Sequence, residues 1–307
     1  MARRVFIDTS RTATNGRKKR KPRVVFDGER VFEVDKLTKL KDVDEVFIDT
    51  LFPEIYEEVL ELLKRDVKVY LLKDTRILKK LRLENSMKKS DENDAILLSR
   101  ISREGFKPLT IQEMEKKVEL WPLINKYELL SKRIKTLKQW IKNDRYDYEL
   151  KNSLRLMEKD KKDVARKITE IFSDDVVYKE ACKALGVKDS VDLAILLNKV
   201  RLDLPLDCIK DYLGLTNNKN NGKYDREMRR RLSQLANTIY VNAKRGALKP
   251  SSLRLINTII TIELREKALY KLEAEIIKIL KRAWRTISNQ TSDRRWPMSG
   301  KSCEASR

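Results

Sequence analysis

The sequence has no histidine and only three cysteines among its 307 residues. Without histidine, acid–base catalysis by imidazole, Ser-His-Asp triads and most zinc sites are excluded. Cys182, Cys208 and Cys303 are far apart and show no CxxC spacing, so we expect reduced thiols rather than a disulfide framework. Any bound metal would then be a hard cation held by carboxylates, which means Mg²⁺ or Mn²⁺.

The sequence also lacks a signal peptide and any long apolar run of membrane-spanning length. Together with the reduced cysteines, this pattern predicts an intracellular, cytoplasmic protein that has no membrane partner.

Basic residues, in contrast, are abundant. The chain carries 69 Lys and Arg against 47 Asp and Glu, which gives a net charge of +22. Such an excess indicates a polyanionic partner, with nucleic acid ahead of a membrane surface. A thermophile surface rich in Lys and Glu is the alternative, but it explains the total charge and not the excess.

Two basic stretches are candidates for phosphate contacts, although either can also be a solvated surface. The first contains Arg17, Lys18, Lys19, Arg20 and Lys21, and the second contains Arg226, Arg229, Arg230 and Arg231.

Residues 1–110 have the pattern of an α/β domain with a mixed sheet. Short apolar runs predict strands at residues 4–8, 24–26, 31–34, 46–49 and 67–72, and Asp27-Gly28 predicts a hairpin between the second and third. Helices are expected from Pro53, from about Thr75 to Leu83, and from Ser90 onward, where Ser90 can cap the first turn.

Four acidic residues stand at the ends of these elements. Asp8 and Asp49 end strands, where open sheets place ligand sites, and Asp91 and Asp94 share one face of the helix that Ser90 begins. Each alone can be a turn or capping residue. Four converging carboxylates would repel one another unless they bound a cation, and with Mg²⁺ they form a site for attack on a phosphodiester. Their combination therefore favours a catalytic metal site.

The remaining sequence is helical in pattern. Apolar residues from Leu120 to Ile171 recur at heptad spacing, with a polar break at residues 143–148, which predicts an antiparallel hairpin or a dimerising coiled coil over residues 111–175. Residues 176–287 are expected to form an all-α domain, in which one long helix runs from about Asn257 to Trp284. Residues 288–307 contain no Leu, Ile or Val and are expected to be disordered.

The segment Lys89-Ser90-Asp91-Glu92-Asn93-Asp94-Ala95, followed by Leu97-Leu98, resembles the K-[ST]-D-x-x-D-A segment of the insertion-sequence "one-ten" (one hundred and ten) transposases, which are also known as bridge-RNA-guided recombinases. The resemblance extends along most of the chain. Asp8 matches the family's first acid, Asp91 and Asp94 match the last two, and Asp49 falls where the family has Glu.

The resemblance implies an RNase H-like, RuvC-type DEDD domain, then a coiled coil and a helical transposase domain. It also implies Mg²⁺ or Mn²⁺ as cofactor, DNA as substrate, a structured guide RNA, a homo-oligomer formed through the coiled coil, and a place beside the prokaryotic nucleoid. The expected activity is DNA transposition or recombination.

The second half carries a further part of the resemblance. Leu185-Gly186-Val187, Tyr212-Leu213-Gly214-Leu215 and Asn221-Gly222 are similar to the family's G-x-G…Y/A-G-L…S-G pattern. The family's nucleophilic serine falls on Asn221, which cannot form a phosphoserine link to DNA, and Ser233 is the nearest downstream hydroxyl.

Three hypotheses follow from the sequence. The chain is a transposase, and the replaced serine suggests a diverged and inactive copy; or it is a RuvC-like nuclease of branched DNA, which needs no serine; or it is a nucleic-acid-binding protein without catalysis.

Overall fold

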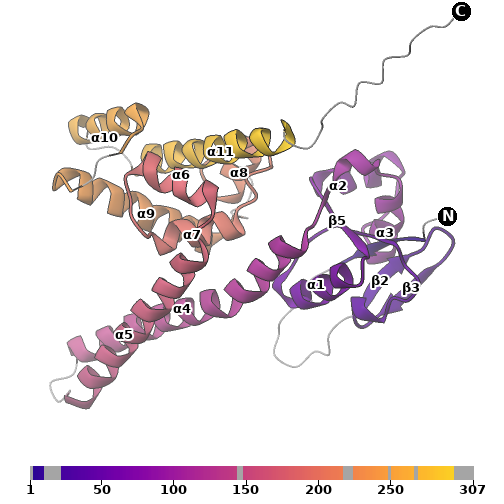
Figure 1. Cartoon of the computed structure of the whole chain (residues 1–307), viewed down its shortest axis with the longest axis horizontal. Coiled ribbons are helices and arrows are strands. Elements are labelled where there is room, and N and C mark those ends of the chain that lie inside the picture. The colour runs from indigo at the N-terminus through magenta and orange to yellow at the C-terminus, as the bar shows by residue number, and fades with distance from the viewer. Residues whose placement is uncertain are drawn as a thin grey trace, which may run out of the picture. The chain divides into compact units, whose positions relative to one another are not determined.

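The structure is a computed structural model that describes residues 3–9, 22–143, 148–216, 224–247, 250–265 and 269–293 (Figure 1). The chain forms two compact units, Met1–Leu129 and Leu130–Arg307. Helix α4 (Ile111–Asn143) begins in the first unit and ends in the second. The structure thus divides the chain in two, whereas the sequence predicted a separate coiled-coil segment at residues 111–175.

The first unit contains a mixed sheet, as predicted. Within the described residues it has six strands in the order β3-β2-β1-β4-β5-β6. Strands β1, β4 and β5 are mutually parallel, whereas the pairs β1–β2, β2–β3 and β5–β6 are antiparallel. The strands span β1 (Arg4–Asp8), β2 (Arg23–Phe26), β3 (Val31–Val34), β4 (Glu45–Ile48), β5 (Lys68–Leu72) and β6 (Phe106–Pro108).

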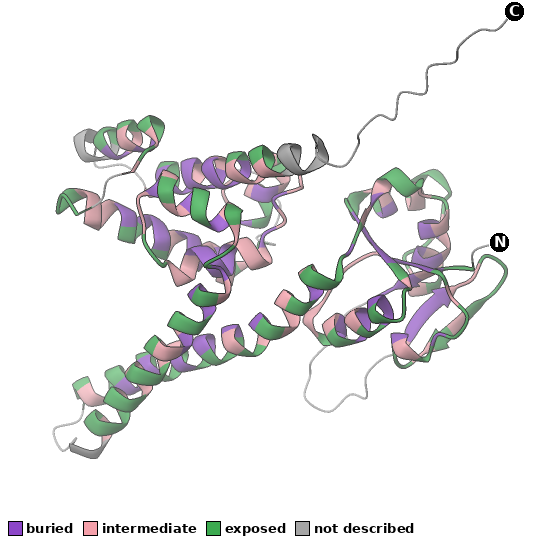
Figure 2. Ribbon diagram, viewed as in Figure 1, coloured by how far each residue is buried: buried purple, intermediate pink, exposed green. Residues whose placement is uncertain are grey.

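Helices cover both faces of this sheet because its side chains alternate between two apolar clusters. Ile7 and Ile48 pack with Val59 and Leu62 of α1 (Tyr56–Lys64) on one face. Phe47 belongs to the other cluster, with Leu97 and Leu98 of α3 (Asp91–Ser99), and α2 (Arg76–Glu84) contacts α3. Figure 2 shows the buried residues concentrated on the strands and on the inward faces of these helices.

A buried ion pair ties the antiparallel edge of the sheet to α1. The Glu58 carboxylate accepts hydrogen bonds from Nη1 and Nη2 of Arg23 on β2, at 2.9 and 3.0 Å. It also accepts one from the backbone N–H of Leu37, at 2.7 Å, at the start of the 3₁₀ turn η1 (Leu37–Lys39). The other 3₁₀ turns are η2 (Pro53–Ile55) and η3 (Arg103–Gly105).

The second unit begins with the C-terminal part of α4 and with α5 (Tyr148–Ile171), on either side of the predicted break. The predicted heptad residues Ile134 and Leu137 on α4 and Val164 and Ile168 on α5 are buried. Lys138 Nζ lies 2.7 Å from a carboxylate oxygen of Glu158, so the two helices are in contact. Pairing of this hairpin with a second chain stays a prediction.

The rest of the second unit is a helical bundle, as predicted, and its core lies where α6 and α9 pack on α11 and α7 packs on α9. Its helices are α6 (Val176–Leu185), α7 (Val191–Lys199), α8 (Leu206–Tyr212), α9 (Arg226–Lys244), α10 (Leu253–Arg265) and α11 (Leu269–Asp293). None of the helices in the described ranges is both long and apolar enough to cross a membrane.

The prediction of one long helix from Asn257 to Trp284 is wrong. The structure has two helices there: α10 ends at Arg265, α11 begins at Leu269, and the two helices pack against each other. The predicted boundary at residue 287 falls inside α11, which continues to Asp293. Residues 294–307 lie outside the described residues.

Candidate functional site

Asp8 and Asp49 lie level with each other at the carboxyl ends of two neighbouring parallel strands. Ile7 on β1 pairs with Ile48 on β4, so the next residue on each strand is one of the two acids. Because side chains alternate along a strand, residues one past Ile7 and Ile48 belong to the face opposite the α1 cluster. That is the face on which α3 packs against β1 and β2.

Thr9 holds the Asp49 carboxylate. Oδ1 of Asp49 accepts hydrogen bonds from the Thr9 backbone N–H at 2.9 Å and from the Thr9 hydroxyl at 2.7 Å. Oδ2 accepts one from the Thr50 hydroxyl at 3.0 Å. Asp8 and Thr9 are both buried. These contacts fix the orientation of Asp49 at the end of β4.

Helix α3 supplies the second pair of acids. Ser90 caps its first turn, and its Oγ accepts a hydrogen bond from the Asn93 backbone N–H at 3.1 Å, as the sequence predicted. Asp94 is 7% exposed, whereas Asp91 is half-buried. The capping role thus belongs to Ser90, and Asp94 projects from the buried side of the helix.

The buried Asp94 carboxyl is in an unfavourable environment for a negative charge. Burial raises its pKa, Arg82 opposes this shift, and the nearby Asp49 raises the pKa further. The repulsion from Asp49 indicates that α3 brings Asp94 within electrostatic range of that strand-end acid.

Arg82 on α2 is the cation nearest this carboxyl. Its Nε lies 3.3 Å from Asp94 Oδ1, and both side chains are largely buried. This Nε donates a hydrogen bond to the Leu78 carbonyl at 3.2 Å, so its contact with Asp94 is an ion pair, and Oδ1 itself accepts no hydrogen bond. The sequence analysis missed Arg82 because a lysine- and arginine-rich helix carries no signal of which cation turns inward.

The chemistry of the donors fits a hard divalent cation, since all are carboxylate oxygens and one buried oxygen is left without a hydrogen bond. The side chains are not gathered into a preformed site, however. In the described part of the chain, no three acidic or cysteine side chains stand close enough together to hold a metal ion. The predicted acids are therefore neighbours across β1, β4 and α3 without forming a closed coordination shell.

The two basic stretches have different outcomes. Residues Arg17, Lys18, Lys19, Arg20 and Lys21 lie outside the described residues. Arg226 and Arg230 at the start of α9 are exposed, which leaves their charges available to a partner.

Arg229 and Arg231 correct the prediction of phosphate contacts. Arg231 is 2% exposed and donates to Asp192 Oδ1 of α7 at 2.8 Å. Arg229 forms an ion pair with the buried Glu273 of α11. Both guanidinium groups hold helices of the bundle together, because consecutive residues on α9 point in different directions and part of the run must face the core.

The hydroxyl suggested by the sequence as a substitute nucleophile is also engaged. Ser233 donates a hydrogen bond to Oε1 of Glu273, the same carboxylate that pairs with Arg229. Asn221 and Gly222 lie outside the described residues. Gly186 ends α6 in the left-handed conformation, with φ of 70°, which a glycine adopts without steric strain.

No protein-family model matches this chain, and a search of curated proteins found no match either.

Proposed function

We propose that this chain is a DNA transposase or recombinase whose first unit carries metal-dependent phosphodiester chemistry on an RNase H-like, RuvC-type fold. One observation carries the proposal: Asp8 and Asp49 lie level at the ends of two parallel strands, and the buried Asp94 on α3 is close enough to Asp49 for the two carboxylates to repel each other. A mixed sheet with helices on both faces is compatible with that fold.

Asp8, Asp49 and Asp94 are the residues that would hold Mg²⁺ or Mn²⁺, with Asp91 at the exposed side of the same helix turn. When bound, the cation would polarise the phosphoryl oxygen, and where no protein nucleophile takes part it would also supply a hydroxide. The chain's own contribution is orientation, since Thr9 fixes the Asp49 carboxylate by two hydrogen bonds. Burial of Asp94 keeps bulk water from screening its charge.

The nucleic acid would be engaged by basic residues of the second unit. Arg226 and Arg230 are exposed at the start of α9, next to residues that lie outside the described ranges. The net charge of +22 favours DNA and a structured guide RNA as partners. The α4–α5 hairpin is the proposed contact of a homo-oligomer.

A RuvC-like nuclease of branched DNA is the second candidate. It is favoured by Asn221, because the serine that would become linked to DNA is absent at that position. A nuclease would use metal-activated water and would never become linked to DNA.

The proposal is tested by cleavage of labelled branched and linear DNA with Mg²⁺, using the wild type, Asp94→Ala and the matched control Glu92→Ala. Glu92 is an exposed acid in the same helix turn. We expect Asp94→Ala to abolish cleavage and Glu92→Ala to retain it. Cleavage that survives Asp94→Ala would exclude this acid cluster as the catalytic site.

Denaturing gels of the same reactions separate the two candidates. A covalent protein–DNA adduct supports the recombinase, whereas cleaved DNA without an adduct supports the nuclease. If DNA binds but no variant and no metal condition gives cleavage, the chain is a binding protein and the proposed chemistry is wrong.

A further inference from the structure

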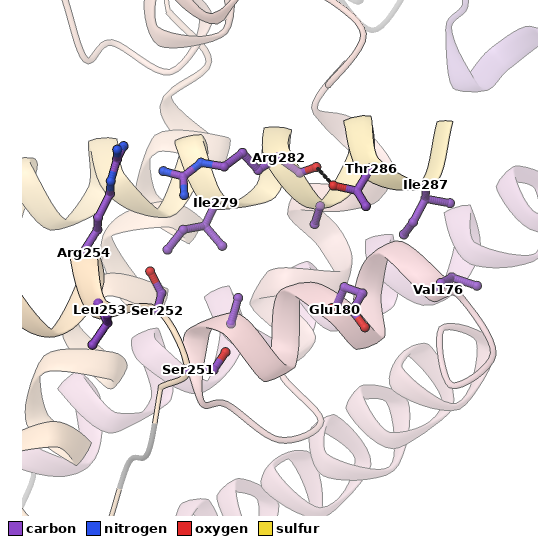
Figure 3. A pocket seen from close by; sticks show the side chains of 12 residues that line it. Val176, Glu180, Ser251, Ser252, Leu253, Arg254, Ile279, Arg282, Thr286 and Ile287 are labelled. Carbon is purple, nitrogen blue, oxygen red and sulfur yellow. Dashed lines mark hydrogen bonds between the residues drawn. The ribbon is translucent and has the colours of Figure 1, made fainter. Parts of the chain in front are cut away.

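A cavity opens in the second unit between α6, the start of α10 and α11, and none of the acids Asp8, Asp49, Asp91 and Asp94 is among its lining residues (Figure 3). Its volume is about 680 Å³. One wall is apolar and includes Ala184, Ile279 and Ala283. The other lining groups are polar or charged, among them Ser251, Ser252, Arg254 and Arg282. A cavity with both kinds of wall is typical of a ligand site.

Two guanidinium groups line this cavity. Arg254 is exposed at the first turn of α10 and, within the described ranges, makes no ion pair. In Figure 3 the Arg282 side chain runs along α11 in the direction of Arg254. Only Glu180, on the α6 wall toward Thr286 and Ile287, carries a negative charge into the lining. The Arg254 end of the cavity is therefore electropositive.

Arg282 is positioned without being saturated. Its Nη2 lies 3.3 Å from Oε1 of the buried Glu275, and Lys278 Nζ lies 3.0 Å from the other oxygen of that carboxylate. A guanidinium has five N–H donors, and this contact with Glu275 uses one of them. Because Lys278 also neutralises Glu275, Arg282 can offer its remaining donors to an anion.

We infer that this cavity binds a phosphate group of a nucleic-acid strand. Two guanidinium groups match a phosphate in geometry and charge, since each can donate two parallel hydrogen bonds. The Ser252 hydroxyl at the beginning of α10 can donate one further hydrogen bond, since its oxygen accepts from the Leu255 N–H, whereas the Ser251 hydroxyl donates to the Lys183 carbonyl. The apolar wall then faces the sugar or base next to the bound phosphate.

The inference rests on the proposed function only for the identity of the polymer, and a free phosphate would meet the same donors. Because Arg254 is exposed at the rim, a strand that passes over the cavity fits this site better than a small anion enclosed within it. The experiment therefore includes both sources of phosphate.

Binding of the full chain to a fluorescein-labelled single-stranded oligonucleotide is measured by anisotropy over a range of NaCl concentrations. The variants are Arg254→Ala, Arg254→Ala with Arg282→Ala, and Ala283→Glu, which places a carboxylate inside the cavity. Arg285→Ala is the matched control, because Arg285 is an exposed cation on α11 outside the lining. A parallel titration adds inorganic phosphate at constant ionic strength.

Each phosphate contact on a single strand contributes about 0.7 to the slope of log K against log salt, so we expect the double variant, which loses the one bound phosphate, to reduce the slope by about 0.7. Arg254→Ala should give about half of that loss, Ala283→Glu should also weaken binding, and Arg285→Ala should leave the slope unchanged. Circular dichroism checks that each variant is folded. If the double variant does not fold, the result for Arg254→Ala alone decides the test.

Equal losses for Arg285→Ala and Arg254→Ala would overturn the inference, because they would show that net charge alone matters. Displacement of the oligonucleotide by millimolar phosphate in the wild type, with an unchanged slope in the double variant, would also overturn it in favour of a small-anion site. Asp94→Ala should keep the full slope of log K against log salt. A failure of the catalytic proposal can therefore be distinguished from a failure of the phosphate site.

Discussion

Arg230 and Arg231 are adjacent on α9 and have opposite environments. Arg231 is buried against Asp192 of α7, whereas Arg230 is exposed. Successive helix residues are about 100° apart around the axis, so neighbours in one basic run can serve stability and binding separately.

Arg231→Ala should lower the free energy of unfolding by about 3–5 kcal/mol, because it leaves Asp192 and its surroundings without the buried cation. Arg230→Ala should change it by no more than about 0.5 kcal/mol, as for an ordinary surface substitution. Urea denaturation measures both values, and DNA titrations should show weaker binding for folded Arg230→Ala. Comparable stability losses for the two variants would contradict the assignment of Arg231 to the core.

Arg82 neutralises Asp94 where a metal ion is proposed to bind. Arg82→Gln keeps the size of the side chain and removes its charge, so it should lower the free energy of unfolding by roughly 3 kcal/mol in the absence of metal. Mg²⁺ should then raise the melting temperature more in this variant than in the wild type, because a bound cation replaces the lost charge.

The control for Arg82 is Lys80→Gln on the same helix, since Lys80 is exposed. Thermal melts with Mg²⁺ and with EDTA measure the shifts. Identical Mg²⁺ shifts in wild type and Arg82→Gln would show that the Asp94 carboxylate is not reached by the ion.

At the scale of elements, Lys281 joins α11 to the segment that follows α7. Its Nζ donates hydrogen bonds to the carbonyls of Leu202, at 2.9 Å, and Leu204, and its side chain is buried. Burial lowers the pKa of Lys281 below its usual 10.5, and the nearby Arg285 lowers it further. A charged ammonium at this position therefore costs folding free energy, which its hydrogen bonds offset.

The lowered pKa of Lys281 predicts a pH dependence of stability. Above its folded-state pKa the native state has released a proton that the unfolded chain keeps up to about pH 10.5. The unfolded state binds more protons in that window, so the free energy of unfolding contributed by Lys281 rises with pH. Urea denaturation between pH 7 and 10 should show wild type gaining stability relative to Lys281→Met. Parallel pH profiles of the two proteins would refute this account.

At the scale of the whole molecule, the α4–α5 hairpin leaves large apolar side chains in solvent. Trp140 is 59% exposed and Leu156 is 66% exposed. If the hairpin joins two chains, the double substitution Trp140→Glu, Leu156→Glu should convert a dimer to a monomer, because it places charge in an apolar contact. Light scattering after size-exclusion chromatography measures the mass.

Gln139→Glu is the control for this substitution, as it adds a negative charge to the same exposed stretch of α4. It should leave the mass of the dimer unchanged. A wild type that is already monomeric at every concentration tested would refute pairing through this hairpin.

Much of the first unit could be predicted because its signals are local. Short continuous apolar runs, one ending in Asp8 and one preceding Asp49, define β1 and β4, and Ser90 with its acidic first turn defines the start of α3. Strand β6 was not predicted, since three residues ending in Pro108 carry too little periodicity.

The features that sequence could not provide depend on contacts between distant residues. The ion pair of Arg82 with Asp94 joins α2 to α3. The burial of Arg231 on α9 likewise requires Asp192 from α7. In a chain with 69 basic residues, composition does not distinguish a cation that faces a partner from one that faces the core. The separation of α10 from α11 was missed for a similar reason, because apolar spacing continues on both sides of it.

Glu58 makes the burial of Arg23 on β2 depend on a residue that comes later in the chain. Its carboxylate is satisfied by Arg23 and by the Leu37 amide, both of which are synthesised before it. Burying Arg23 without Glu58 would leave an uncompensated charge in the core. We therefore expect the β2–β3 hairpin to dock stably only once Glu58 is in place, so that α1 and the hairpin complete the sheet together.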